Sequence, residues 1–177
     1  MRALLIPLVT AVAVLTGAAS ANAAVTSCDG VGVTADNVVY GTCNTDQNGG
    51  AGSVGFSSDG LTATLAARTQ RGAHQVAAFW QSNGPVAATT QICVSFHASE
   101  LTLRGAGTLN AYLLISSNGA TQLVSAQAIA DTNSVDFCWS VPPDATNIWW
   151  QLQIVAGGDK PMSQVQAAVT VDSVTIS

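Results

Sequence analysis

The chain has 177 residues, of which 8% are charged and 48% are hydrophobic, and its formal net charge is −5. Ten acidic residues outnumber five Lys and Arg residues, and no basic run offers a nucleic acid or an anionic membrane a place to bind. A surface rich in polar residues but poor in charge favours neutral polar ligands over ions.

The first residues are typical of a secretory signal peptide. One basic residue precedes a short apolar stretch, and Ala21-Asn22-Ala23 has the small-x-small form of a cleavage site. The apolar stretch is too short to cross a bilayer, and no later segment is apolar for long enough. We therefore expect residues 1–23 to be removed, and residues 24–177 to form one secreted, extracellular domain without membrane insertion.

After the leader, helical periodicity is nearly absent. Short alternating runs recur instead, bounded by Gly, Asn, Asp, Ser and Pro, which is typical of a β-sandwich or barrel. The glycine-rich residues 44–53 are expected to form a loop. The predicted strands lie near residues 38–39, 61–68, 74–81, 91–98, 109–116, 122–128, 135–141, 148–155 and 165–176.

Alternation also predicts details within these strands, because successive side chains of a strand point to opposite faces. Trp139 is expected in the core, whereas the pattern leaves open whether Phe79 or Trp80 faces outward. In the last strand the alternation slips, which predicts a β-bulge at Asp172 and Ser173.

Four cysteines follow the leader, and an even number in an exported chain indicates two disulfides with three possible pairings. Cys93 and Cys138 fall on the non-core faces of their strands, as a disulfide between neighbouring strands requires. Cys28 and Cys43 are close in sequence. We therefore favour the pairs Cys28 with Cys43 and Cys93 with Cys138. The spacings do not match a zinc site, so the cysteines indicate no metal cofactor.

Two adjacent tryptophans occur in the run TNIWWQLQIVAGG. If Ile148, Trp150 and Leu152 face the core, Trp149 must lie on the outer face of the same strand. One explanation for a large aromatic there is a ligand. The alternative is that Trp149 lies under a long loop and belongs to a minor hydrophobic cluster.

Alternation places amides and a second aromatic residue on outer faces as well. Gln151 and Gln153 follow Trp149, and Tyr112 lies outward with Asn110 on another strand. Aromatic rings cover the apolar face of a pyranose, while amides donate to and accept from its hydroxyls. These residues have the composition of a sugar-binding face. The alternative for Tyr112 is an ordinary surface position, which the hydroxyl of a tyrosine makes easy to occupy.

Catalytic residues are harder to find in the sequence. Glycoside hydrolysis usually needs two positioned carboxylates, and Glu100 has no visible partner. No G-x-S-x-G elbow accompanies the histidines. His97 is expected to be an ordinary cross-strand residue and His74 to belong to a turn. The sequence thus favours a protein that is not an enzyme.

Four motifs follow one another in the C-terminal half, residues 91–177: TTQICVSFHASEL, LNAYLLISSNG, VDFCWSVPPDATNIWWQLQI and VTVDSVTIS. In this order they resemble the jelly-roll carbohydrate-binding modules of the galactose-binding-like superfamily. The resemblance implies an all-β, two-sheet antiparallel jelly-roll β-sandwich that binds a glycan through aromatics and amides on its concave strands. The positions that match these binding residues are Tyr112, Trp149, Gln151 and Gln153.

The resemblance also implies a structural calcium ion bound by a carboxylate of the last strand. Asp172 is the matching residue here, but Ser173 replaces the second acid of the family. No other cofactor is expected.

Together these observations predict a secreted bacterial, lectin-like monomer that recognises a neutral polysaccharide or a cell-surface glycan without catalysis. The main alternative is a structural or protein-binding role at the cell envelope, as a coat component or as an inhibitor of an exported hydrolase. In that case Trp149 and Tyr112 would be interface anchors. A third hypothesis is a small hydrolase with an acid that the pattern does not reveal.

Overall fold

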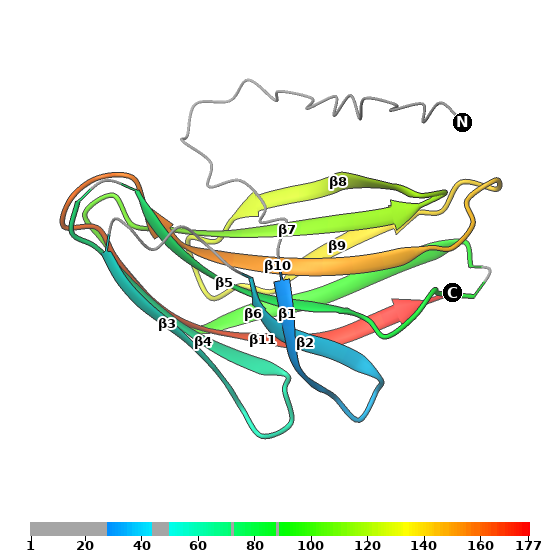
Figure 1. Cartoon of the computed structure of the whole chain (residues 1–177), viewed down its shortest axis with the longest axis horizontal. Helices are drawn as coiled ribbons and strands as arrows, with labels where there is room; N and C mark the ends of the chain where they lie inside the picture. Colours follow the sequence, from blue (N-terminus) through cyan, green and yellow to red (C-terminus); the bar gives the residue numbers. More distant parts are fainter. Residues whose placement is uncertain (1–27, 44–49, 72, 88) are drawn as a thin grey trace, which may run out of the picture.

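The computed structural model describes residues 28–43, 50–71, 73–87 and 89–177 (Figure 1). They form eleven strands in two antiparallel sheets, which lie face to face as the two layers of a sandwich. No helix within these residues has the length and apolarity to cross a membrane. The predicted all-β, two-sheet antiparallel jelly-roll sandwich is therefore confirmed. The signal peptide and its cleavage site lie outside the described residues.

The larger sheet has six strands in the order β1-β2-β5-β10-β7-β8. Its central strand β10 pairs with β5 on one side and with β7 on the other. The bounds of its strands are β1 Cys28–Val33, β2 Val38–Cys43, β5 His74–Ser82, β7 Thr108–Ser117, β8 Ala120–Ala128 and β10 Trp149–Gly158.

The smaller sheet has five strands in the order β3-β4-β11-β6-β9. Its central strand β11 pairs with β4 and with β6. The bounds of its strands are β3 Gly50–Phe56, β4 Thr62–Thr69, β6 Gln91–Arg104, β9 Val135–Ser140 and β11 Gln164–Ile176.

The main core fills the space between the sheets with alternate side chains of nearly every strand. Trp80 and Trp150 are 0% and 2% exposed, which resolves the open assignment on β5, because Trp80 points inward and Phe79 outward. The indole nitrogen of Trp80 donates to the Gly60 carbonyl oxygen at 2.8 Å, so this buried donor is satisfied. Trp139 is half-buried and packs against the core, as predicted.

Both predicted disulfides are confirmed, Cys28–Cys43 and Cys93–Cys138. In each case the two cysteines lie directly opposite one another on paired antiparallel strands. Cross-strand neighbours of this kind bring their Cβ atoms close enough for a disulfide. The described residues contain no free cysteine.

The prediction that residues 44–53 form a loop is wrong from Gly50 onward, while residues 44–49 lie outside the described ranges. Strand β3 begins at Gly50 and runs along the edge of the smaller sheet, paired with β4 alone. The glycine allows the two backbones to approach closely, because a Cβ at Gly50 would collide with the carbonyl oxygen of Arg68. His74 is a second correction, because it is the first residue of β5 and is buried rather than in a turn.

The β-bulge predicted at Asp172 and Ser173 is confirmed. The register of β11 against β6 shifts between Val171 and Ser173, and the inward alternation resumes beyond the shift. At the bulge, the side chain of Asp172 is exposed.

Candidate functional site

Trp149 is the first residue of β10 and lies on the outer face of the six-stranded sheet. It is 38% exposed, whereas the adjacent Trp150 is buried. Trp149 and Gln151 line a shallow depression of about 320 Å³ on this face. The other side chains that line it on the same sheet face are Gln81, Leu114, Ser116 and Thr121.

A row of three amides runs across the sheet beside Trp149. The side-chain nitrogen Nε2 of Gln151 donates to Oε1 of Gln81 at 2.9 Å, and Nε2 of Gln153 donates to Oε1 of Gln151 at 2.6 Å. These bonds follow from the sheet register, because Gln81 lies directly opposite Gln151 and Gln153 lies two residues further along β10. The row holds its amides in fixed positions before a ligand arrives, which lowers the entropy cost of binding.

Tyr112 shares this outer face and pairs directly with Gln153 on the neighbouring strand. However, Tyr112 is only 4% exposed and Gln153 is fully buried. Tyr112 belongs to a second hydrophobic cluster, on the outer face of the sheet, together with Phe79 and Val155. Its burial removes the phenol from water and so raises the pKa of Tyr112.

The five residues predicted to bind a ligand therefore lie on one sheet face but in two environments. Trp149 and Gln151 line the depression, whereas Tyr112 and Gln153 are buried beyond it, and Asn110 is half-buried opposite Val155. Gln153 reaches the depression through its hydrogen bond to Gln151. The sequence did not single out four further lining residues, Gln81, Leu114, Ser116 and Thr121. Leu114 and Ser116 follow Tyr112 at two-residue intervals, so the alternation that places Tyr112 outward applies to them as well.

Asp172 does not have the surroundings of a calcium site in this structure. Its two carboxylate oxygens lie 2.8 and 2.9 Å from Nδ1 of His97, on the neighbouring strand β6. The described residues contain no group of three or more His, Cys, Asp or Glu side chains that could hold a metal ion. The carboxylate thus faces a group that is a cation when protonated, and the described residues place no cluster of further acidic side chains around it. Calcium binding stays an untested prediction with no support from this donor set.

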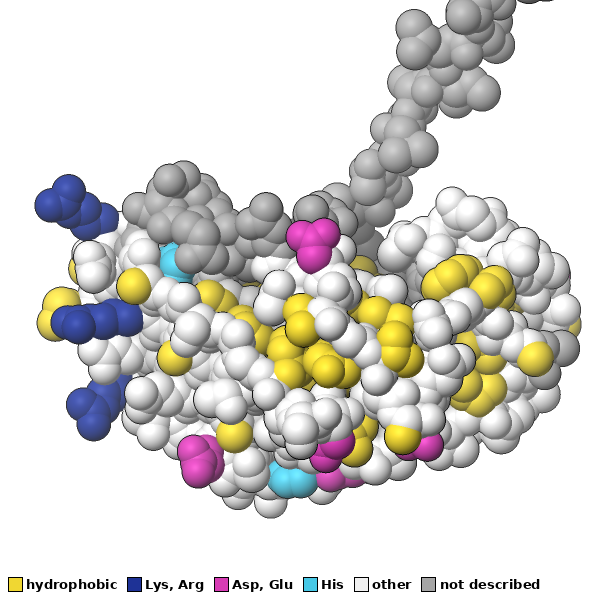
Figure 2. Space-filling view, turned by 60° about the horizontal axis from the view of Figure 1, so that its bottom comes forward, with side chains coloured by type: hydrophobic (Ala, Val, Ile, Leu, Met, Phe, Trp, Pro, Cys, Tyr) yellow, Lys and Arg dark blue, Asp and Glu magenta, His cyan; other side chains and the backbone are white. Residues whose placement is uncertain are grey.

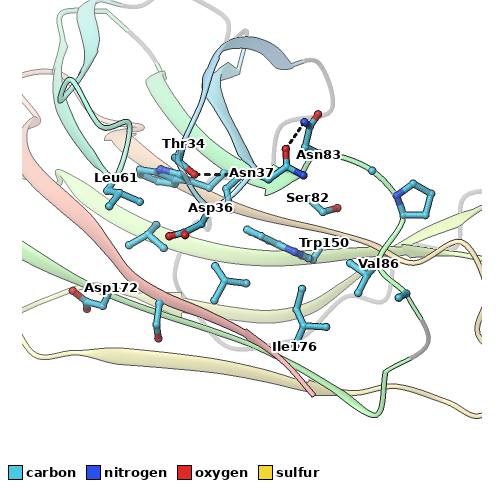
Figure 3. Close-up of a pocket in the computed structure, with 18 residues that line it drawn as sticks. Thr34, Asp36, Asn37, Leu61, Ser82, Asn83, Val86, Trp150, Asp172 and Ile176 are labelled. Atoms are coloured by element: carbon cyan, nitrogen blue, oxygen red, sulfur yellow. Dashed lines mark hydrogen bonds between the residues drawn. The ribbon is translucent and has the colours of Figure 1, made fainter.

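A separate cleft of about 460 Å³ opens between the two sheets at one end of the sandwich (Figure 3). Its inner wall includes Trp80 and Trp150, of which little surface is accessible. The Asn83 amide nitrogen donates to the Asn37 side-chain oxygen at 2.8 Å, which ties together two loops at the rim. The hydroxyl of Ser82 also lines the cleft, and it is buried without a hydrogen-bond partner among the described residues.

The two cavities differ in what they offer a ligand. The end cleft combines aliphatic side chains with polar residues that include Asp36 and Asp172, and its tryptophans are already packed in the core, with little surface left for a ligand. The depression presents an exposed indole next to ordered amides and two hydroxyls. The depression is therefore the better site for a ligand with one apolar face and many hydroxyls.

No family model matches the chain, and no curated protein matches it. Solved structures with a similar fold do exist. The structure of a CBM4 is 17% identical with a TM-score of 0.43, and the match covers 78% of this chain and 86% of that one. CBM28, a carbohydrate-binding module specific for non-crystalline cellulose, is 10% identical with a TM-score of 0.40 and coverages of 86% and 98%. TmCBM61 in complex with β-1,4-galactotriose is 9% identical with a TM-score of 0.35 and coverages of 82% and 84%.

These similar structures are carbohydrate-binding modules. The C-terminal motifs of the sequence resemble the same group of proteins. At identities of 9–17% the likeness concerns the fold, and the function must be inferred from the side chains of this chain.

Proposed function

We propose that this protein is a secreted, non-catalytic carbohydrate-binding protein that holds a neutral polysaccharide or cell-surface glycan in the Trp149 depression. The observation that carries the proposal is the exposed indole of Trp149 beside the hydrogen-bonded row of Gln81, Gln151 and Gln153. A sugar ring stacks its apolar face on the indole, and its hydroxyls bond to the amides of Gln81 and Gln151, while the buried Gln153 holds Gln151 in place.

The rest of the depression fits the same ligand chemistry. Ser116 and Thr121 add hydroxyl groups, and Leu114 adds apolar surface. None of the described residues that line the depression carries a charge. A neutral ligand therefore finds hydrogen-bond partners there without having to neutralise a charge, while an ion finds no counter-charge.

Secretion is supported by the two disulfides, which form and persist in oxidising compartments outside the cytosol. The non-catalytic assignment is supported by the depression itself, since its lining, as far as the structure describes it, includes no carboxylate, histidine or cysteine that could act as an acid, a base or a nucleophile. We expect the protein to act as a monomer.

Retention on insoluble polysaccharides tests this proposal. We expect the wild-type protein to be retained on at least one of cellulose, mannan and xylan, and Trp149→Ala to lose about tenfold or more in affinity because the stacking surface is removed. Val31→Ala is the matched control, because Val31 is an exposed hydrophobic residue of the same sheet that lies away from the depression. Its retention should equal that of the wild type.

The alternative, a structural or inhibitory protein of the cell envelope, predicts a different result. Trp149 would then anchor a protein interface, and no polysaccharide would retain the wild-type chain. That outcome, or equal retention of the wild type and Trp149→Ala, would refute the glycan site.

A further inference from the structure

The basic residues of the described chain are scattered in sequence but lie together at one end of the sandwich. The Lys and Arg side chains visible in Figure 2 lie at its left edge. Backbone bonds explain the gathering, because Thr69 at the end of β4 bonds to Met162 and Ser163 in the turn before β11. The residues concerned are Arg68, Arg71, Arg104 and Lys160. The absence of a basic run in the sequence therefore does not prevent a basic patch in the fold.

Two of these side chains flank one residue of the central strand. Gln164 of β11 pairs with Arg68 of β4 on one side and with Arg104 of β6 on the other. Two strand spacings separate the arginine Cα atoms, which is about 9.5 Å. Both arginines are exposed on the outer face of the five-stranded sheet, since the preceding Ala67 faces the core and Gln164 is followed by the buried Val165.

A groove of about 570 Å³ runs between the two arginines, and we call it the arginine groove. Its floor consists of small or uncharged polar side chains, which leave the space between the guanidinium groups open. The floor residues are Ser53, Ala66, Thr102, Gln164 and Gln166.

Neither guanidinium group forms a salt bridge with a carboxylate of the described residues. The ion pair found among those residues joins His97 and Asp172, which do not line the groove. Glu100 lies on the same sheet face but pairs with Ala168. That position is four residues along β11 from Gln164, or about 13 Å away. Among the described residues, the groove thus holds two guanidinium groups with no carboxylate between them.

We propose that the arginine groove binds an acidic polysaccharide, with the carboxylates of its uronate units paired to Arg68 and Arg104. A guanidinium group accepts a carboxylate in a bidentate arrangement, and this charge-assisted pair is stronger than a neutral hydrogen bond. Gln164, Gln166 and Thr102 supply amide and hydroxyl groups for the sugar hydroxyls between the charges.

The groove goes beyond the neutral-glycan proposal, because it lies on the other sheet and at the other end of the molecule. Trp149 and Gly158 begin and end β10, and Gly158 contacts the turn that carries Ser163. Nine residues of strand separate the two ends by about 30 Å.

A nucleic acid fits the groove less well than an acidic polysaccharide. None of the described residues that line the groove has an aromatic side chain on which bases could stack.

Native gel electrophoresis with polymer in the gel tests the arginine groove. We expect polygalacturonate to retard the wild-type protein, dextran to leave it unretarded, and 0.3 M NaCl to weaken the retardation because salt screens exposed charges at about this concentration. Arg68→Gln with Arg104→Gln should raise the dissociation constant about tenfold or more, since two charge-assisted contacts are lost.

Arg71→Gln with Lys160→Gln is the matched control. It removes the same charge from the same end of the molecule but from residues that do not line the groove. Its dissociation constant should stay within about twofold of the wild type, as should that of Trp149→Ala, which separates this proposal from the neutral-glycan site.

Three results would overturn the proposal. One is an unretarded wild-type protein in polygalacturonate, and another is equal loss in the two double variants, which would indicate charge without a site. The third is arginine-dependent retardation by dextran sulfate or RNA but not by polygalacturonate, which would assign the groove to a different anion.

Discussion

Trp149 and Trp150 are neighbours in the chain, yet they have opposite roles because one residue of strand reverses the direction of a side chain. Trp150 fills the core between the sheets, while Trp149 forms one wall of a surface depression. Alternation alone predicted this division. It did not reveal that Tyr112 is buried on the outer face, because alternation gives the direction of a side chain and contains no information about what packs over it.

Tyr112 gives a prediction at the same scale. Its hydroxyl has no hydrogen-bond partner among the described residues, so Tyr112→Phe should change the unfolding free energy at pH 7 by less than about 1 kcal/mol. The raised pKa has a further effect at alkaline pH. Above the ordinary tyrosine pKa of about 10, the unfolded chain loses the phenol proton while the native protein keeps it, so stability falls as pH rises.

Urea unfolding at a series of pH values measures this effect. We expect the wild type to lose more stability than Tyr112→Phe as the pH rises from about 9 to about 11. Tyr40 is present in both proteins and serves as the internal control. An equal decline in both would show that Tyr112 does not cause it.

At the scale of elements, hydrophobic alternation located the strands that contribute to the core. It did not predict strands β1 and β3, and the sequence indicated a glycine-rich loop where β3 begins. Both are edge strands with glycine-containing sequences, CDGVGV and GAGSVGF, and each pairs with one neighbour only. Most of their side chains are exposed and only a few pack against the core, so their sequences carry little periodic signal.

The two disulfides close chain segments of different length and should therefore differ in their contribution to the free energy of unfolding. Cys93–Cys138 closes a sequence separation of 45 residues and Cys28–Cys43 one of 15. The chain-entropy model assigns them roughly 4 and 3 kcal/mol. We therefore expect Cys93→Ala with Cys138→Ala to lower the unfolding free energy by about 1 kcal/mol more than Cys28→Ala with Cys43→Ala, as measured by urea unfolding.

The reverse order would also be informative. Cys43 is buried beside Phe79 and Tyr112, whereas Cys138 is exposed. A larger loss at Cys28–Cys43 would contradict the entropic order and assign the difference to packing in the native state.

At the scale of the whole molecule, the fold brings together what the sequence separates. Arg68 and Arg104 belong to strands that are not adjacent in the chain, and they meet only because β11 lies between β4 and β6. Periodicity predicts strands and faces but not the order of strands in a sheet, so the arginine groove could not be found from the sequence. The composition correctly indicated an acidic molecule, but not how its few positive charges are distributed.

The two proposed sites together lead to a prediction for the intact protein. Because they lie on opposite sheets and at opposite ends, one molecule can hold a neutral and an acidic polysaccharide at the same time. We expect wild-type protein to carry soluble polygalacturonate into the pellet of an insoluble neutral polysaccharide that retains it. Trp149→Ala should abolish this transfer of polygalacturonate, and so should Arg68→Gln with Arg104→Gln. The double arginine variant should still be found in the pellet itself, because its Trp149 depression is unchanged.

A uronate assay of the pellet measures the transfer. Transfer that survives either substitution would contradict simultaneous binding at the two sites.

The uneven burial of the tryptophans also has a spectroscopic consequence. Trp80 and Trp150 are shielded from water and Trp139 is half-buried, while Trp149 is 38% exposed. Collisional quenchers in solution therefore reach the indole of Trp149 more readily than the others. The residue proposed to stack on sugar is thus also the fluorophore that reports whether its surface is occupied.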